Sequence, residues 1–196
     1  HEPSRRQRQM CIRDRESPIP KLAEARDQTQ IMGMPYIGIN VSDLDASVFF
    51  YRRFGYETLR WINEQTLSPE ESAAWGFDQP VTYRGADVAI ERGDHHRLRL
   101  LQWIEPFDPD PAYPPPINHK GINRLALTVP DVERAVRILE KQGVPFLSAV
   151  APCCSGTDTD TGGIVHAIDP DGTFLELVGN LEPRPVEPQP EHLSLI

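Results

Sequence analysis

The chain has 196 residues, enough for one ordinary domain or two small modules, and 39% hydrophobic with 25% charged residues is typical of a soluble globular protein. The formal net charge of -9 argues against nucleic acid or an anionic membrane as a partner, because binding phosphate groups requires a basic surface. The sequence contains no pattern typical of a transmembrane span or a secretory leader, so we expect a cytoplasmic protein.

Three segments lack the patterns of folded elements. Residues 1–31 are polar and arginine-rich without an apolar period, so we expect a disordered tail. Its run RRQRQMCIRDR resembles translated adapter sequence found in metagenomic assemblies, so part of this tail is expected to be non-native. Residues 106–120 and 181–196 are proline-rich, which predicts a stiff linker and an extended or disordered tail, respectively.

Two segments of the remaining chain repeat each other. The sequence YIGINVSDLDASVFFYRRFGYETL, from Tyr36, aligns without a gap on RLALTVPDVERAVRILEKQGVPFL, from Arg124. Each segment predicts a strand, a helix with an N-terminal cap, a glycine that ends the helix, and a second strand. We expect each helix to cover one face of a sheet through an apolar stripe, formed by Leu44, Val48, Tyr51, Val132, Val136 and Leu139.

Each copy continues into a β-hairpin, so each predicts a βαβββ module, over residues 32–105 and 121–180. The first hairpin is expected to turn at residues 92–94, and the first module also contains an insertion whose Ser68 and Pro69 predict a short helix.

The second hairpin turns at Asp169-Pro170-Asp171-Gly172, a sequence typical of a three-residue loop with a G1 bulge. This turn places His166 opposite Glu176, with Phe174 next along the same face. The sequence therefore predicts an imidazole and a carboxylate as cross-strand neighbours.

These features resemble the vicinal-oxygen-chelate superfamily, which includes glyoxalases, extradiol dioxygenases, and the bleomycin and fosfomycin resistance proteins. The resemblance rests on the two modules, the INVSDLDASVFFY start and the DPDGTFLELVG end, and it covers roughly residues 34–180. It implies a glyoxalase-like α+β fold in which two tandem βαβββ modules pair edge to edge into a curved mixed sheet around a cleft. It leaves the chemistry open, because this superfamily contains lyases, isomerases, oxygenases and simple binding proteins.

The resemblance also locates a possible site. Metal-binding members take their ligands from four inward strand positions, which on this chain hold Tyr36, Arg99, Arg124 and Glu176. Alternation along the strands supports these positions, because the apolar neighbours take the helix-covered face. Only Glu176 offers a normal ligand, since arginine has no lone pair to give and its charge repels a cation. We therefore expect no metal cofactor.

The site residues have roles that the resemblance implies. We expect Glu176 and His166 to be catalytic and to move protons, while Arg124 and Arg99 bind a substrate carboxylate, phosphate or enolate. A structural alternative pairs the two arginines with Glu176. Further substrate-binding candidates are Tyr36, Asn40, Thr128, Phe174 and Trp103.

The preferred function is a metal-independent lyase or isomerase acting on a small anionic or carbonyl-bearing organic molecule. A ligand-sequestering protein of the bleomycin-resistance type is the alternative from another class. A third hypothesis keeps a metal-dependent enzyme such as a dioxygenase, with Glu176, His166 and His119 as ligands. The expected partner is a small-molecule ligand, and a homodimer is left open.

Overall fold

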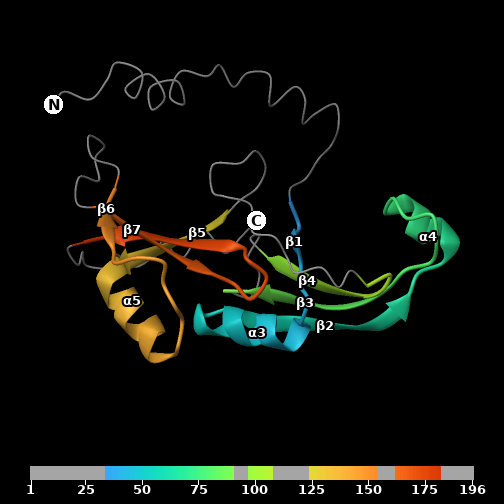
Figure 1. Cartoon of the computed structure of the whole chain (residues 1–196), viewed down its shortest axis with the longest axis horizontal. Helices are drawn as coiled ribbons and strands as arrows, with labels where there is room; N and C mark the ends of the chain where they lie inside the picture. Colours follow the sequence, from blue (N-terminus) through green and yellow to red (C-terminus); the bar gives the residue numbers. More distant parts are fainter. Residues whose placement is uncertain (1–33, 91–96, 108–123, 154–161, 182–196) are drawn as a thin grey trace, which may run out of the picture. The chain divides into compact units, whose positions relative to one another are not determined.

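The computed structural model describes residues 34–90, 97–107, 124–153 and 162–181 (Figure 1). The chain divides into two units, His1–Pro35 and Tyr36–Ile196, and the second contains both repeated segments. The predictions for the tail at 1–31 and for the turn at 92–94 lie outside the described residues, as do those for His119 and for most of the two proline-rich segments.

The first module forms a four-stranded sheet with two helices (Figure 1). The strand order is β1-β4-β3-β2, in which β1 and β4 are parallel and the other neighbours are antiparallel. Its elements are β1 (Ile37–Asn40), α3 (Leu44–Arg53), β2 (Glu57–Thr66), α4 (Pro69–Ala74), β3 (Thr82–Ala89) and β4 (Leu98–Glu105). The predicted inserted helix is α4, with Ser68 and Glu71 forming a capping box.

The second segment forms a sheet of the same topology, ordered β5-β8-β7-β6. Its elements are β5 (Arg124–Asp131), α5 (Val132–Lys141), β6 (Ala151–Pro152), β7 (Gly162–Ile168) and β8 (Phe174–Asn180). The predicted α+β fold of two βαβββ modules is therefore confirmed. One detail differs from the expectation, because the described strands form two separate four-stranded sheets and not one sheet paired edge to edge.

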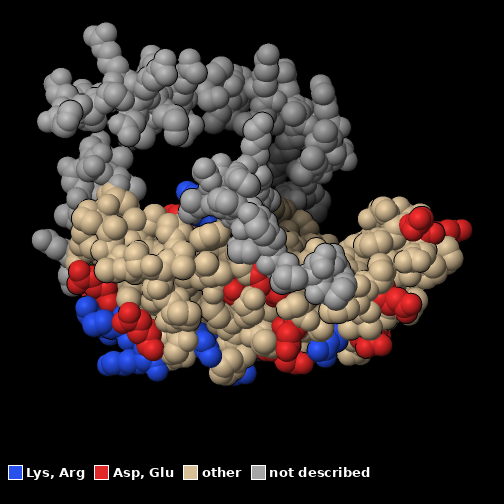
Figure 2. All heavy atoms as spheres, viewed as in Figure 1, with Lys and Arg blue, Asp and Glu red and all other residues tan. Residues whose placement is uncertain are grey.

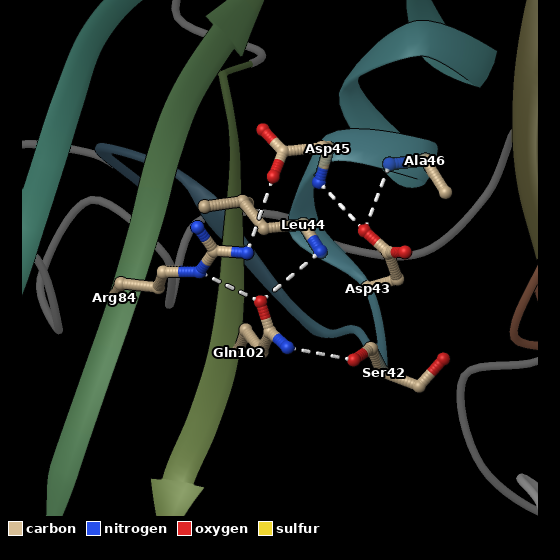
Figure 3. Close-up of polar contacts among 7 residues, drawn as sticks. All are labelled: Ser42, Asp43, Leu44, Asp45, Ala46, Arg84 and Gln102. Atoms are coloured by element: carbon tan, nitrogen blue, oxygen red, sulfur yellow. Dashed lines mark hydrogen bonds and ion pairs between the residues drawn. The ribbon is translucent and has the colours of Figure 1, made fainter.

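The start of α3 is tied to the sheet beneath it (Figure 3). Asp43 is the N-cap, and its carboxylate accepts hydrogen bonds from the first turn of the helix. Gln102 on β4 accepts a hydrogen bond from the Leu44 backbone at 3.3 Å and donates one to the Ser42 carbonyl at 2.8 Å. Arg84 on β3 donates from Nε to the same Gln102 oxygen at 2.8 Å. This face of the first sheet is therefore the helix-covered face.

The core confirms the predicted alternation. All six residues of the predicted apolar stripes are buried, and so are the strand residues that face them, among them Ile39, Leu98, Leu100, Leu175 and Leu177. The residues between them in sequence must point to the other side of each sheet, because strand side chains alternate. We call that side the helix-distal face, and it carries all the predicted catalytic and substrate-binding residues, which lie within the described part of the chain.

The two modules meet where the β7–β8 turn contacts α3. Tyr51 Oη on α3 donates a 3.0 Å hydrogen bond to Asp169 Oδ2, and Asp171 Oδ1 accepts one from the Ser42 backbone at 3.0 Å. Gly172 takes the positive φ of 92° that the predicted turn requires. Burial raises the pKa of Asp169 above its usual range although its hydrogen bonds act in the opposite direction.

Candidate functional site

Three side chains of the second module meet at a single carboxylate oxygen. Arg124 Nε lies 2.6 Å from Glu176 Oε2, and His166 Nε2 lies 3.1 Å from the same atom. The Glu176 side chain is 9% exposed, whereas His166 is 20% exposed and Arg124 is 44% exposed. Phe174 stands beside His166 with the two rings edge to face, their centroids 6.3 Å apart. We call these four residues the Glu176 cluster.

The strand register explains how this cluster forms. His166 on β7 pairs directly with Glu176 on β8, as the turn sequence predicts, because the three-residue loop sets Ile168 opposite Phe174. On the other side of β8, Arg124 on β5 pairs with Phe174. Phe174 and Glu176 are neighbours on the same face of β8, so the Arg124 side chain can reach Glu176. The two strands that flank β8 thus bring a guanidinium and an imidazole to the Glu176 carboxylate.

The first module holds a second ionic group, which we call the Arg99 cluster, formed by Tyr36, Arg60, Asp87 and Arg99. Arg99 donates to Asp87 from Nε at 2.7 Å and from Nη2 at 3.1 Å. Arg60 Nη2 donates to Asp87 Oδ2 at 2.9 Å. The ring of Tyr36 lies under the guanidinium, with Arg99 Cζ 3.8 Å from the ring centroid.

Electrostatics in the Arg99 cluster favour the ionised pair. Burial alone would raise the pKa of Asp87, but the hydrogen bonds and charges of Arg99 and Arg60 outweigh it and hold that pKa below its usual range. The hydrogen bonding of Arg99 to Asp87 raises the pKa of Arg99. Asp87 is therefore an anion that holds arginines in position and is poorly suited to accept a proton.

The two clusters occupy equivalent positions in the two modules, with the acidic and the basic side chain exchanged between the paired strands. Asp87 pairs with Arg99 in the first hairpin as His166 pairs with Glu176 in the second. Arg99 in the first module thus corresponds to Glu176 in the second. The hypothesis that Arg99 pairs with Glu176 is wrong, because Arg99 has a carboxylate partner on its own neighbouring strand.

The remaining predicted residues lie apart from these ion pairs. Asn40 Oδ1 accepts a 3.1 Å hydrogen bond from Trp103 Nε1, so these two candidates contact each other. Thr128 is exposed on β5. The sequence reasoning missed Asp87 and Arg60, although the repeat offered a signal, since the first hairpin's register sets Asp87 opposite Arg99.

The residues at the family's metal positions offer few donor atoms for a divalent metal. The four positions that metal-binding relatives use hold Tyr36, Arg99, Arg124 and Glu176, and both arginines already bond to carboxylates. A cation at Glu176 Oε2 would lie against the Arg124 guanidinium, which repels it. Among the residues that the structure describes, no group of three or more His, Cys, Asp or Glu is placed to hold a metal ion. This donor set does not fit the usual divalent metal.

Comparison with known proteins identifies the family. Residues 33–177 match the Glyoxalase/Bleomycin resistance protein/Dioxygenase superfamily, and the chain belongs to it. A lactoylglutathione lyase of Schizosaccharomyces pombe is 30% identical over 159 residues, which cover 75% of this chain and 47% of that protein. The chain thus spans about half the length of this curated relative.

Solved structures agree on the fold. A glyoxalase family protein from Bacillus cereus superposes with a TM-score of 0.62 at 18% identity, over 78% of this chain and 96% of that one. Glyoxalase I from Zea mays superposes with a TM-score of 0.54 at 20% identity, over 76% of this chain and 45% of that one. At these identities the likeness establishes the architecture alone. No helix in the described part of the chain is long and apolar enough to cross a membrane.

Proposed function

We propose that this chain is a glyoxalase-like enzyme of the lyase or isomerase kind that acts, without a metal, on a small anionic or carbonyl-bearing organic molecule. The observation that carries the proposal is the shared oxygen: Arg124 and His166 both contact Glu176 Oε2. A mostly buried carboxylate touching a half-exposed guanidinium and a partly exposed imidazole combines a base, a proton carrier and a charge stabiliser.

The proposed step is proton removal next to a carbonyl group. Glu176 accepts the proton from carbon, and the C–H electron pair moves so that negative charge develops on the carbonyl oxygen. Arg124 stabilises that charge, because its guanidinium donates charged hydrogen bonds. His166 takes the proton from Glu176. In a substrate with a hydroxyl group on the carbon that loses the proton, return of the proton to the former carbonyl carbon, with transfer of the hydroxyl proton to the carbonyl oxygen, completes an isomerisation. In a substrate with a leaving group on the carbon beyond the one that loses the proton, re-formation of the carbonyl expels that group with its electron pair and leaves a carbon–carbon double bond, which completes an elimination.

The name of the Schizosaccharomyces pombe relative supplies the first substrate to test, lactoylglutathione. We expect the full chain, purified in a chelating buffer, to act on it, as followed by exchange of the proton next to the thioester carbonyl with solvent deuterium. Glu176→Gln should lower the rate about a hundredfold or more, because it removes a general base. Glu140→Gln, the same change on the exposed side of α5, where acidic and basic side chains lie together (Figure 2), should leave the rate unchanged. Equal rates for the wild type and Glu176→Gln would contradict the proposal.

A ligand-sequestering protein of the bleomycin-resistance type is the second candidate. The ion pair between Arg124 and Glu176 favours this candidate, because pairing alone accounts for a buried carboxylate beside an arginine and requires no catalytic role. Ligand binding without turnover, and without effect of Glu176→Gln, would favour this candidate over the enzyme.

A further inference from the structure

We propose that the helix-distal face of the first module binds the oxyanion group of an organic ligand, received by Arg99 and positioned by Asp87 and Tyr36. The inference rests on the proposed function for the ligand being a small organic molecule. It adds the residue that receives the charged group, the two residues that orient it, and the space the ligand enters.

The guanidinium of Arg99 has one edge in use and one edge available. Asp87 takes the side edge, through Nε and Nη2. The end edge, between Nη1 and Nη2, points away from Asp87, and Nη1 has no hydrogen bond within the described residues. Such an edge matches the two oxygens of a carboxylate or a phosphate.

Arg99 is held before any ligand arrives. The Tyr36 ring covers one face of the guanidinium, Asp87 fixes the side edge, and the Arg99 side chain remains 20% exposed. An arginine that is already ordered loses little side-chain entropy on binding, so more of the interaction energy contributes to affinity.

The sheet surface next to the backbone of Arg99 is open. Gly38 on β1 pairs with Arg99 on β4, and it lies on the helix-distal face because its neighbour Ile39 is in the core. A Cβ placed on Gly38 meets no atom within 4 Å. On the same face, a Cβ on Gly85 would lie 2.5 Å from the Leu100 carbonyl oxygen, so that position, unlike Gly38, has no room for a side chain.

The local charge and surface favour an anion with an apolar body. Arg60, which shares Asp87, has a side chain that is 61% exposed, and the exposed Arg97 continues the alternation of Arg99. This face therefore carries three arginines and two carboxylates, those of Asp87 and, on the edge strand, Glu57, in a chain whose net charge is -9. Beyond Arg99, the same face of β4 carries Leu101 and the half-buried Trp103.

The test uses the full chain with phenyl phosphate as the probe and benzyl alcohol as its neutral analogue, measured by isothermal titration and by fluorescence. We expect phenyl phosphate to bind more tightly than benzyl alcohol. Arg99→Gln should weaken phenyl phosphate about tenfold or more, since a charged hydrogen-bonding fork is lost. Gly38→Leu should weaken it as strongly by filling the space, and Gly38→Ala should weaken it less.

Asp87→Asn separates positioning from charge. The substitution removes a negative charge, so phenyl phosphate should bind more tightly if Arg99 acts only as a charge. We expect weaker binding, because the guanidinium loses its fixed orientation. Arg84→Gln is the matched control, because Arg84 lies on the helix-covered face of the same sheet, pairing with Asp45 at 3.2 Å (Figure 3). It removes one positive charge, as Arg99→Gln does, and should leave phenyl phosphate affinity unaltered.

The site would be wrong if phenyl phosphate bound no better than benzyl alcohol, or if Arg99→Gln and Gly38→Leu left its affinity unchanged in folded protein. An equal loss in Arg84→Gln would also overturn it, since only net charge would then matter. These outcomes are separate from the failure of the enzyme proposal. Loss of turnover in Glu176→Gln with normal probe binding in Arg99→Gln would leave that proposal standing and refute only the oxyanion site.

Discussion

Tyr51 Oη and Asp169 Oδ2, 118 positions apart in the sequence, form a 3.0 Å hydrogen bond that joins the helix of the first module to the hairpin turn of the second. That hairpin carries both His166 and Glu176, which face each other three or four residues beyond the turn. The contact is buried, and Asp169 also accepts hydrogen bonds from the Asp171 and Thr173 backbone. The hairpin that carries His166 and Glu176 is therefore held at its turn by the other module.

The first prediction tests this contact. Tyr51→Phe should lower the free energy of unfolding by about 1–3 kcal/mol at neutral pH, because a buried carboxylate oxygen loses its donor. Tyr83→Phe is the matched control, since Tyr83 is also buried but bonds the neutral amide of Gln65. Urea denaturation of both variants measures the difference. A Tyr51→Phe variant as stable as the wild type would show that the hydrogen bond contributes nothing.

The pH dependence of the Tyr51 effect has a definite sign. Burial raises the pKa of Asp169, so the folded chain favours the protonated form. This contribution to stability is complete below the unfolded pKa of about 3.8 and is lost as pH rises through the folded value. Tyr51 donates to the charged form and offsets that loss, so Tyr51→Phe should cost more at neutral pH than in acid. A constant cost across the pH range would contradict this account.

The second prediction concerns Asp87. Its pKa is lowered in the folded chain, so its contribution is present above the unfolded value of about 3.8 and is lost as pH falls through the folded value. Asp87→Asn should therefore reduce the free energy of unfolding by about 2 kcal/mol at neutral pH and by progressively less in acid. Asp45→Asn, which removes an exposed partner of Arg84, should have little effect. Equal losses in the two variants would refute the structural role of Asp87.

The third prediction separates an ion pair from an active site. Arg124→Met removes the charge beside Glu176, so it should destabilise the fold if neutralisation is the main role of Arg124. The double variant Arg124→Met with Glu176→Gln should then recover much of the loss. In the enzyme account, the single variant instead weakens an anionic ligand by about 2 kcal/mol. Full recovery of stability with unchanged ligand affinity throughout would support the structural pair.

The fourth prediction concerns metal content. Because the four family positions hold Tyr36, Arg99, Arg124 and Glu176, protein purified without added metal should carry no stoichiometric transition metal. Elemental analysis measures this directly. Near one equivalent of iron, manganese, nickel or zinc, retained through mild chelation and lost in Glu176→Ala, would be decisive evidence against metal independence.

Much of the fold could be predicted because local signals and the repeat agreed. Asp43 and Asp131 cap their helices, Gly55 and Gly143 take positive φ after them, and the predicted stripes are buried. The pairing of His166 with Glu176 also followed from sequence, since the turn fixes the register.

The relationships between distant segments were harder to predict. The bond between Tyr51 and Asp169 left no local signal, because it depends on how two separately patterned modules pack. The partner of Arg99 is Asp87 on the neighbouring strand, whereas the structural alternative paired Arg99 with Glu176; the family positions name strand residues and do not indicate which of them bond to each other. The two separate sheets likewise reflect packing between modules, which strand patterns do not specify.

The most direct test of the account is deuterium incorporation at the carbon next to the carbonyl of lactoylglutathione, followed by proton NMR in D2O. We predict that the wild-type chain catalyses the exchange in the presence of a chelator, and that Glu176→Gln abolishes it while keeping its fold. His166→Gln should slow it, since the imidazole that touches Glu176 Oε2 is removed. Exchange that persists in Glu176→Gln, or that appears only when a metal is added, would contradict the account.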